Sequence, residues 1–204
     1  KKSSMSLFLI SGLIFLLINT NIGEIYNVVE SINKIQGYSI AIPVVLIISI
    51  SKLYTSTIGC VNNIISNSNF YQYILFFSIF SALSLFFLNI YFIENIGLIG
   101  AAYSTLIIIV VFNLLKIILV LVKLKIQPYS INSIKLFFII TVLYLIFSNL
   151  EFDFLSAISS LIIKSIIISI IYMSICYYLN ISKEINNVIN SFIKKIRPEK
   201  GNQA

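Results

Sequence analysis

Six long apolar runs divide this chain, and they limit the folds that it can adopt. They span residues 5–18, 39–57, 71–93, 98–122, 134–147 and 155–179. A helix needs about 20 mostly apolar residues to cross the hydrocarbon core of a bilayer. The runs are unbroken, whereas the strands of a membrane barrel alternate polar and apolar residues. The sequence therefore predicts an all-α, polytopic transmembrane helical bundle of about six spans, with the first and fifth spans short and a kink at Pro43 in the second.

The composition also favours a membrane protein over a soluble one. Apolar residues make up 59% of the 204 residues and charged residues only 10%, whereas a soluble domain carries roughly 25% charged residues. So few charges could not cover the wet surface of a soluble fold. The chain enters an apolar run almost at once after Lys1, without the pattern of a cleaved signal peptide. We interpret this start as a truncation, so that an N-terminal part of the same protein is missing.

The charges between the runs predict how the spans are oriented, because lysine and arginine concentrate on the cytoplasmic side. One set of connections carries mostly acidic residues: Glu24, Glu30, Lys34, Glu94, Glu151 and Asp153. The other set and the tail carry basic residues: Lys1, Lys2, Lys123, Lys125, Lys135, Lys183, Lys194, Lys195, Arg197 and Lys200. Both termini are therefore predicted to be cytoplasmic. This placement of the basic residues explains the net charge of +7 better than a nucleic-acid partner does.

Two further segments have the pattern of helices that lie on a membrane surface. The first carries Ile22, Ile25, Val29 and Ile32 on one helical face, and Asn21 with Glu24 has the spacing of a capping box. It is predicted to be a short helix on the outer surface.

The second is the tail at residues 180–204, in which apolar residues recur at helical period from 181 to 196. Its polar face is basic, so that it could bind an anionic inner leaflet of membrane lipids. Packing against the inner loops is the alternative, and the pattern does not separate the two.

Metal, redox and catalytic motifs are missing from the sequence. There is no histidine, and Cys60 and Cys176 stand far apart without a Cys-x-x-Cys pattern. We therefore expect no metal and no cofactor. None of the six runs contains an aspartate or glutamate, although a membrane-embedded hydrolase or acyltransferase needs a histidine or carboxylate to move protons. The sequence thus predicts that the chain is not an enzyme.

Polar residues within the runs are the candidate binding residues, because ionisable groups inside a membrane are costly and usually face a cavity. Lys164 lies near the middle of the sixth run, and its expected partner is an anionic substrate or a carboxylate in the missing part. Lys52 and Lys116 lie nearer the ends of their runs, so that snorkelling to the interface is the alternative for both. Asn113 stands on the same helical face as Lys116. Lysines in a cavity suit an anionic group such as a phosphate.

Several segments resemble a known transporter family. They are GLIGAAYSTL at 97–106, KIQPYS at 125–130, KLYT at 52–55 and CVNNIISNSNFY at 60–71. Together with the hydropathy pattern over nearly the whole chain, they resemble the C-terminal region of bacterial oligosaccharide and polysaccharide flippases. These flippases belong to the same superfamily as the multidrug exporters of the toxic-compound extrusion type.

The resemblance implies two helical bundles around a central cavity, of which this chain would supply the last six of fourteen helices. It implies alternating access that moves a lipid-linked, polyprenyl-diphosphate oligosaccharide across the inner membrane, for surface polysaccharides such as the O-antigen of lipopolysaccharide. Two other functions stay open: a multidrug exporter of the same fold, and a membrane polysaccharide polymerase. A deep carboxylate upstream would favour the exporter, and a ring of cavity lysines or arginines would favour the flippase.

Overall fold

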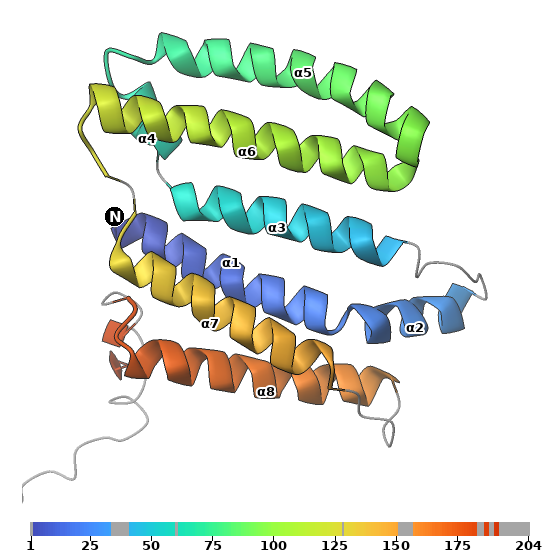
Figure 1. Ribbon diagram of the computed structural model, residues 1–204. Helices are drawn as coiled ribbons and strands as arrows, with labels where there is room; N and C mark the ends of the chain where they lie inside the picture. The colour runs from blue at the N-terminus through green and yellow to red at the C-terminus, as the bar shows by residue number, and fades with distance from the viewer. Residues whose placement is uncertain are drawn as a thin grey trace, which may run out of the picture.

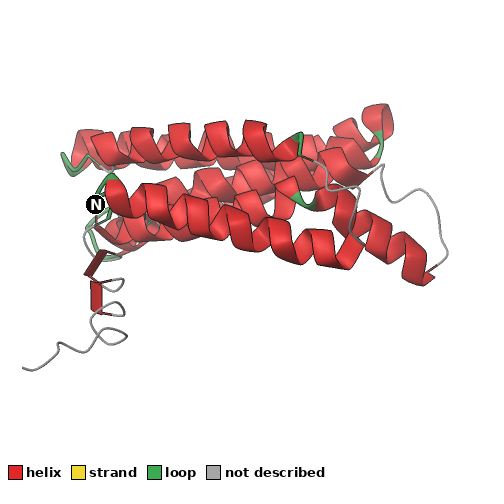
Figure 2. Ribbon diagram, turned by 90° about the horizontal axis from the view of Figure 1, so that it is seen from below, coloured by secondary structure: helices red, strands yellow, loops and turns green. Residues whose placement is uncertain are grey.

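A computed structural model describes residues 2–33, 41–59, 61–127, 129–150, 157–182, 186–187 and 190–191. These residues form eight helices, and none of them lies in a strand (Figure 2). The all-α prediction is therefore confirmed for the described part of the chain.

Each predicted span corresponds to one helix. The six are α1 (Lys2–Thr20), α3 (Ile42–Ile58), α5 (Gln72–Ile96), α6 (Leu98–Lys123), α7 (Ile131–Ser148) and α8 (Ala157–Tyr178). Two shorter helices lie between them, α2 (Ile22–Asn33) and α4 (Val61–Ser66). The predicted surface segment after the first span is thus helical, as its apolar face indicated.

The number of helices that could cross a membrane is smaller than six. Among the described residues, α5, α6, α7 and α8 are each long and apolar enough. A fifth span exists if α1 and α2 count as one, because together they are long and apolar enough, although the chain bends by 52° between them. Helix α3 has 17 residues and is shorter than a full span. The structure therefore has four or five helices that fit a multi-pass membrane protein.

Pro43 does not kink a helix. It stands in the first turn of α3, next to the N-cap residue Ala41. Proline lacks a backbone N–H, and the first turn of a helix has no carbonyl for that group to bond. The kink that the sequence predicted there is wrong: Pro43 helps to begin the helix instead of bending it.

The long helices lie roughly side by side, and α1 has the most neighbours among them. Helices α5, α6, α3 and α1 lie side by side in that order, and α7 and α8 pack against α1 (Figure 1). Helix α1 thus touches α3, α7 and α8, and its buried side chains Phe8, Leu9 and Leu16 belong to the largest apolar cluster. At the other end of the row, α5 has no buried residues. Many of its large apolar side chains are exposed, as they would be on a face that contacts lipid.

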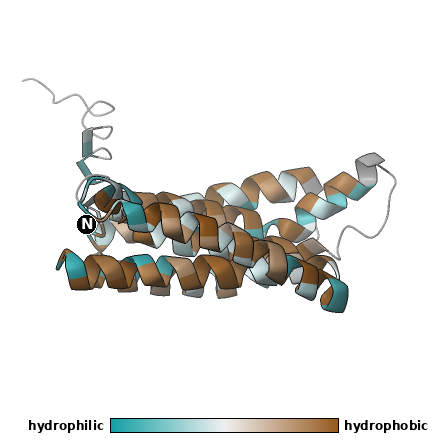
Figure 3. Cartoon of the chain, turned by 90° about the horizontal axis from the view of Figure 1, so that it is seen from above, coloured by the Kyte–Doolittle hydropathy of each residue, from teal (hydrophilic) through white to brown (hydrophobic). Residues whose placement is uncertain are grey.

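Opposite charges lie at opposite ends of the bundle. Lys123 ends α6, and Lys125 and Lys135 surround the connection to α7, at the end where the N-terminus lies (Figure 1). Glu94 precedes the turn between α5 and α6 at the other end, where α2 also lies. Between the ends, the helices are coloured mostly as hydrophobic (Figure 3). Because the helices alternate in direction, the charge pattern of the sequence becomes a separation in space.

The apolar core reaches the beginning of the predicted tail. Ile181 is buried in the cluster around α1, and Asn132 Nδ2 donates a hydrogen bond to its carbonyl oxygen at 3.1 Å. Packing against the bundle therefore holds the beginning of the tail. Most of the segment from 183 to 204 lies outside the described residues, so its predicted membrane binding stays a prediction.

Candidate functional site

Helix α1 breaks at three consecutive polar residues, which are all buried. Asn19, Thr20 and Asn21 are 5%, 4% and 1% exposed. Their side chains donate hydrogen bonds to the carbonyl oxygens of Phe15 at 2.8 Å, Leu16 at 2.6 Å and Leu17 at 2.7 Å. Polar side chains that bond back to the preceding turn compete with the backbone and bend helices. This local chemistry explains why the chain turns by 52° into α2 at this point.

Asn21 joins the break to helix α8. Its Nδ2 group also donates to the hydroxyl of Ser165 at 3.3 Å. Its Oδ1 atom is buried and accepts no hydrogen bond from a described residue, so that Asn21 does not cap the amides of α2. The predicted capping box is therefore wrong, because the Asn21 side chain turns back toward α1 and α8 instead of forward.

The most enclosed charges form an ion pair beside this break. Lys164 Nζ on α8 donates to Glu24 Oε1 on α2 at 3.1 Å, and the two side chains are 2% and 17% exposed. The sequence predicted that the partner of Lys164 would come from the substrate or from the missing part of the protein. That prediction is wrong as far as the ion pair is concerned, because Glu24 of the same chain provides the opposite charge.

The sequence missed this pair because it assigned α2 to the membrane surface. Helix α2 instead packs against α8 and to a smaller extent against α1. Glu24 lies in the first turn of α2, where a carboxylate also interacts favourably with the helix dipole. The only signal in the sequence was the close succession of Asn19, Thr20, Asn21 and Glu24 after an apolar run.

Lys52 has different surroundings. It is exposed and lines a groove of about 430 Å³ between α1 and α3. Two serines share this groove with it, Ser11 from α1 and Ser49 from α3. The rest of the lining is apolar: Ile14, Phe15, Ile18, Val45, Ile48 and Leu53. Lys52 makes no ion pair with a described residue, so that its ammonium is available to an external anion.

Lys116 and Asn113 lie close together on α6, but their side chains are buried to different extents. Asn113 is buried at 8% exposure, whereas Lys116 is only partly buried. Their predicted polar stripe therefore has one enclosed member, the amide. The substrate path past Lys116 and Asn113 stays a prediction.

The structure does not gather the three deep lysines into one cavity. Lys164 lies on α8 in the half of the bundle near α2, because α8 begins at that end. Lys52 and Lys116 lie on α3 and α6 in the half near the basic ends. Among the described residues, Lys164 belongs to the ion pair at the α1–α2 break, Lys52 lines the open groove, and Lys116 belongs to neither.

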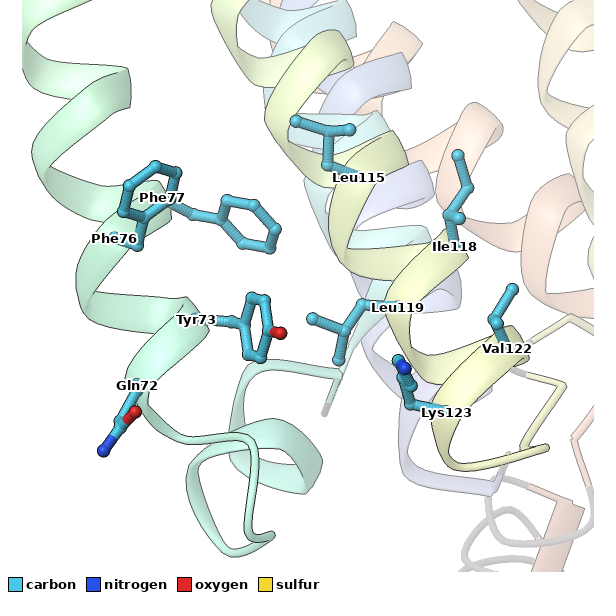
Figure 4. A pocket seen from close by; sticks show the side chains of 9 residues that line it. All are labelled: Gln72, Tyr73, Phe76, Phe77, Leu115, Ile118, Leu119, Val122 and Lys123. Carbon is cyan, nitrogen blue, oxygen red and sulfur yellow. The ribbon is translucent and has the colours of Figure 1, made fainter.

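A third feature is an aromatic groove that the sequence did not predict. It lies between the beginning of α5 and the end of α6 and has a volume of about 560 Å³. Tyr73 and Phe77 point from α5 toward α6, and Leu119 faces them (Figure 4). Its polar members, Gln72 and Lys123, lie at the end of the bundle. A groove of this composition suits a hydrocarbon chain and offers no acid–base chemistry.

Metal chemistry has no support among the described residues, which contain no group of three or more metal-binding side chains. Comparison with known proteins identifies no relative: no family model, no curated protein and no solved structure matches the chain significantly. The geometry of the chain therefore carries the functional argument.

Proposed function

We propose that the chain is part of a flippase, which moves a lipid-linked, polyprenyl-diphosphate oligosaccharide across the bacterial inner membrane by alternating access. The protein would act as a transporter and not as an enzyme. Its partners would be the lipid-linked substrate, the surrounding membrane lipids and an N-terminal half of the same protein.

One observation carries this proposal: a buried ion pair at a broken helix within an apolar bundle. A charge at the bilayer centre costs about 2.5–3.5 kcal/mol even on the mild insertion scale, and such groups mark substrate or ion paths. Helices that break within the membrane are typical of transporters, where the break forms part of a site that changes shape. The Asn19–Asn21 break with Glu24 and Lys164 combines both features.

The arrangement of charges supports an orientation for this transporter. In the proposed topology α1 with α2, α3, α5, α6, α7 and α8 provide six spans. The end with Lys123, Lys125 and Lys135 faces the cytoplasm, and the end with Glu94 faces outward. Both termini of the chain are then cytoplasmic.

Two alternatives make different demands on the same site. A polysaccharide polymerase needs a free acid or base, whereas Glu24, at the α1–α2 break, is held by Lys164 at 3.1 Å. A multidrug exporter takes apolar cations, for which an unpaired lysine in the Lys52 groove is repulsive. An anionic amphiphile fits an apolar groove that carries one ammonium. The flippase is therefore the function that the geometry favours.

The test is transport by the intact protein, including any residues that precede Lys1 in its gene. Proteoliposomes would receive a fluorescent polyprenyl-diphosphate oligosaccharide in the outer leaflet. A quenching reagent added outside reaches only the label in the outer leaflet. If the protein makes part of the label inaccessible to this reagent, the lipid has moved to the inner leaflet, and the result supports the flippase. Transport of a cationic dye without movement of the labelled lipid would favour the exporter, and lengthening of the glycan would favour the polymerase.

The role of Lys164 needs its own variants. Glu24→Lys alone and Lys164→Glu alone should each break the ion pair and lower the abundance of the protein. The double variant, which exchanges the two charges, should restore the ion pair and normal abundance. If Lys164 also holds the substrate's diphosphate, the exchanged protein is abundant but does not transport. If it transports normally, the pair is structural and the proposed substrate role of Lys164 is wrong.

A further inference from the structure

The groove between α1 and α3 combines an exposed lysine, Lys52, with two hydroxyl groups, Ser11 and Ser49, on otherwise apolar walls. Lys164 is enclosed and paired with Glu24, and Lys116 is partly buried. Lys52 is exposed, and it lies about six residues, or 9 Å at 1.5 Å per residue, from the end of α3 at Ile58. Its backbone therefore lies within the helix and not at its end.

The register of α1 and α3 places hydroxyl groups beside this ammonium. Ser4 Oγ donates to the carbonyl oxygen of Thr57 at 2.7 Å, which fixes the antiparallel helices near the basic end. Ser11 and Ser49 then meet near the middle of the two helices, where both line the groove with Lys52. The Ser11 hydroxyl now donates to the carbonyl oxygen of Phe8 at 3.0 Å, and rotation about χ1 can redirect it.

The rest of the groove is suited to hydrocarbon. Beyond the serines, the walls are Ile14 and Ile18 from α1 and Val45 and Ile48 from α3. The volume of about 430 Å³ is in the range of about 300–1,000 Å³ that is usual for ligand sites. A molecule that fits both parts has a phosphate at one end and a hydrocarbon chain at the other.

We propose that this groove binds the phosphate end of the lipid-linked substrate, with the phosphate on Lys52, Ser11 and Ser49 and the first isoprene units along Ile14, Ile18, Val45 and Ile48. This inference rests on the proposed function and names the part of the substrate that this site holds. Charge complementarity is its basis: unlike Lys164, the Lys52 ammonium pairs with no carboxylate among the described residues, so that no ion pair within the described part of the chain must break when the phosphate enters.

The test is photo-crosslinking of the intact protein in proteoliposomes with a polyprenyl diphosphate that carries a diazirine in its first isoprene units. Peptide mapping should place the label on residues 11–18 and 45–53. Lys52→Gln should raise the lipid concentration at half-saturation of labelling by about tenfold or more, which corresponds to the loss of one charge-assisted hydrogen bond. Lys52→Arg should recover part of the lost affinity. Lys135→Gln removes an exposed lysine that lines neither groove; it is the matched control and should leave the concentration at half-saturation unchanged.

Two outcomes would overturn the site. One is a label that maps elsewhere or persists equally in Lys52→Gln at equal abundance. The other is equal competition by phosphatidylglycerol and by unlabelled polyprenyl diphosphate, which would make the groove a seat for ordinary anionic lipid. Crosslinking does not require transport. Specific labelling without transport by the wild type would contradict the flippase and not the groove, and transport without labelling would contradict the groove alone.

Discussion

Lys164 Nζ lies 3.1 Å from Glu24 Oε1 although 140 positions separate the two residues in the chain. The pair fastens α2, at the end of the bundle, to α8. It converts a lysine that would be costly in a bilayer into half of a neutral pair. The Lys164 side chain is only 2% exposed, so that water cannot replace Glu24 as its partner.

Removal of one charge from this pair should destabilise the protein. Glu24→Gln leaves the Lys164 ammonium buried without a counter-charge, which costs up to about 3–5 kcal/mol in buried pairs. We expect a lower midpoint in denaturant-induced unfolding of the protein in detergent micelles. Lys164→Met in the same chain should recover most of the loss, because it removes the unpaired charge and keeps the volume.

The matched control for this change is Glu94→Gln, since Glu94 is exposed at the same end of the bundle. It should shift the midpoint little. Equal midpoints for Glu24→Gln and Glu94→Gln would mean that the ion pair contributes nothing to stability.

Gly100 should tolerate no side chain. A Cβ atom at this position would overlap the carbonyl oxygen of Phe92 on α5, and small residues are what allow helices to approach closely in membranes. Gly100→Val should therefore separate α5 from α6 and lower stability by about 1–3 kcal/mol, as overpacking does. Gly23→Val is the control, since nothing lies within 4 Å of its Cβ position. A cysteine crosslink between α5 and α6 that forms equally in both variants would contradict the expected separation.

Tyr172 should stabilise the centre of the bundle through its hydroxyl group. The side chain is fully buried, and its hydroxyl donates to the carbonyl oxygen of Leu9 at 2.8 Å. Tyr172→Phe keeps the ring and removes this bond between α8 and α1, which should cost about 0.5–1.5 kcal/mol. The same substitution at the exposed Tyr91 should cost less, and unfolding midpoints of the two variants give the comparison. A larger loss at Tyr91 than at Tyr172 would disagree with the packing described above.

The predicted topology can be measured with single cysteines in a background without Cys60 and Cys176. A cysteine in place of Glu94 should react with an impermeant thiol reagent in intact cells, because that end of the bundle is predicted to face outward. A cysteine in place of Lys125 should react only after the membrane is opened. The opposite result would invert the orientation.

The positions of the long helices could be predicted from the sequence because they depend on local composition. Runs of apolar residues at 71–93 and 98–122 became α5 and α6 within a few residues, with Gly97 at φ +63° between them. The separation of basic and acidic ends followed as well, since alternating helix directions place every second connection at the same end. The effect of Pro43 was harder to predict. A proline kinks a helix when it lies in the interior but is favourable in the first turn, and the residue alone does not show where the helix begins.

The sequence by itself determined a helical chain for an apolar solvent, with a basic and an acidic set of connections and with lysines at depth that need an anion. Only the tertiary structure decided which anion each lysine meets. The direction in which α2 leaves the break after Asn19–Asn21 brings Glu24 to Lys164, while the crossing of α1 and α3 leaves Lys52 open beside Ser11 and Ser49. Both outcomes depend on contacts between residues far apart in the chain. Periodicity and hydropathy describe one helix at a time and carry no information about such contacts.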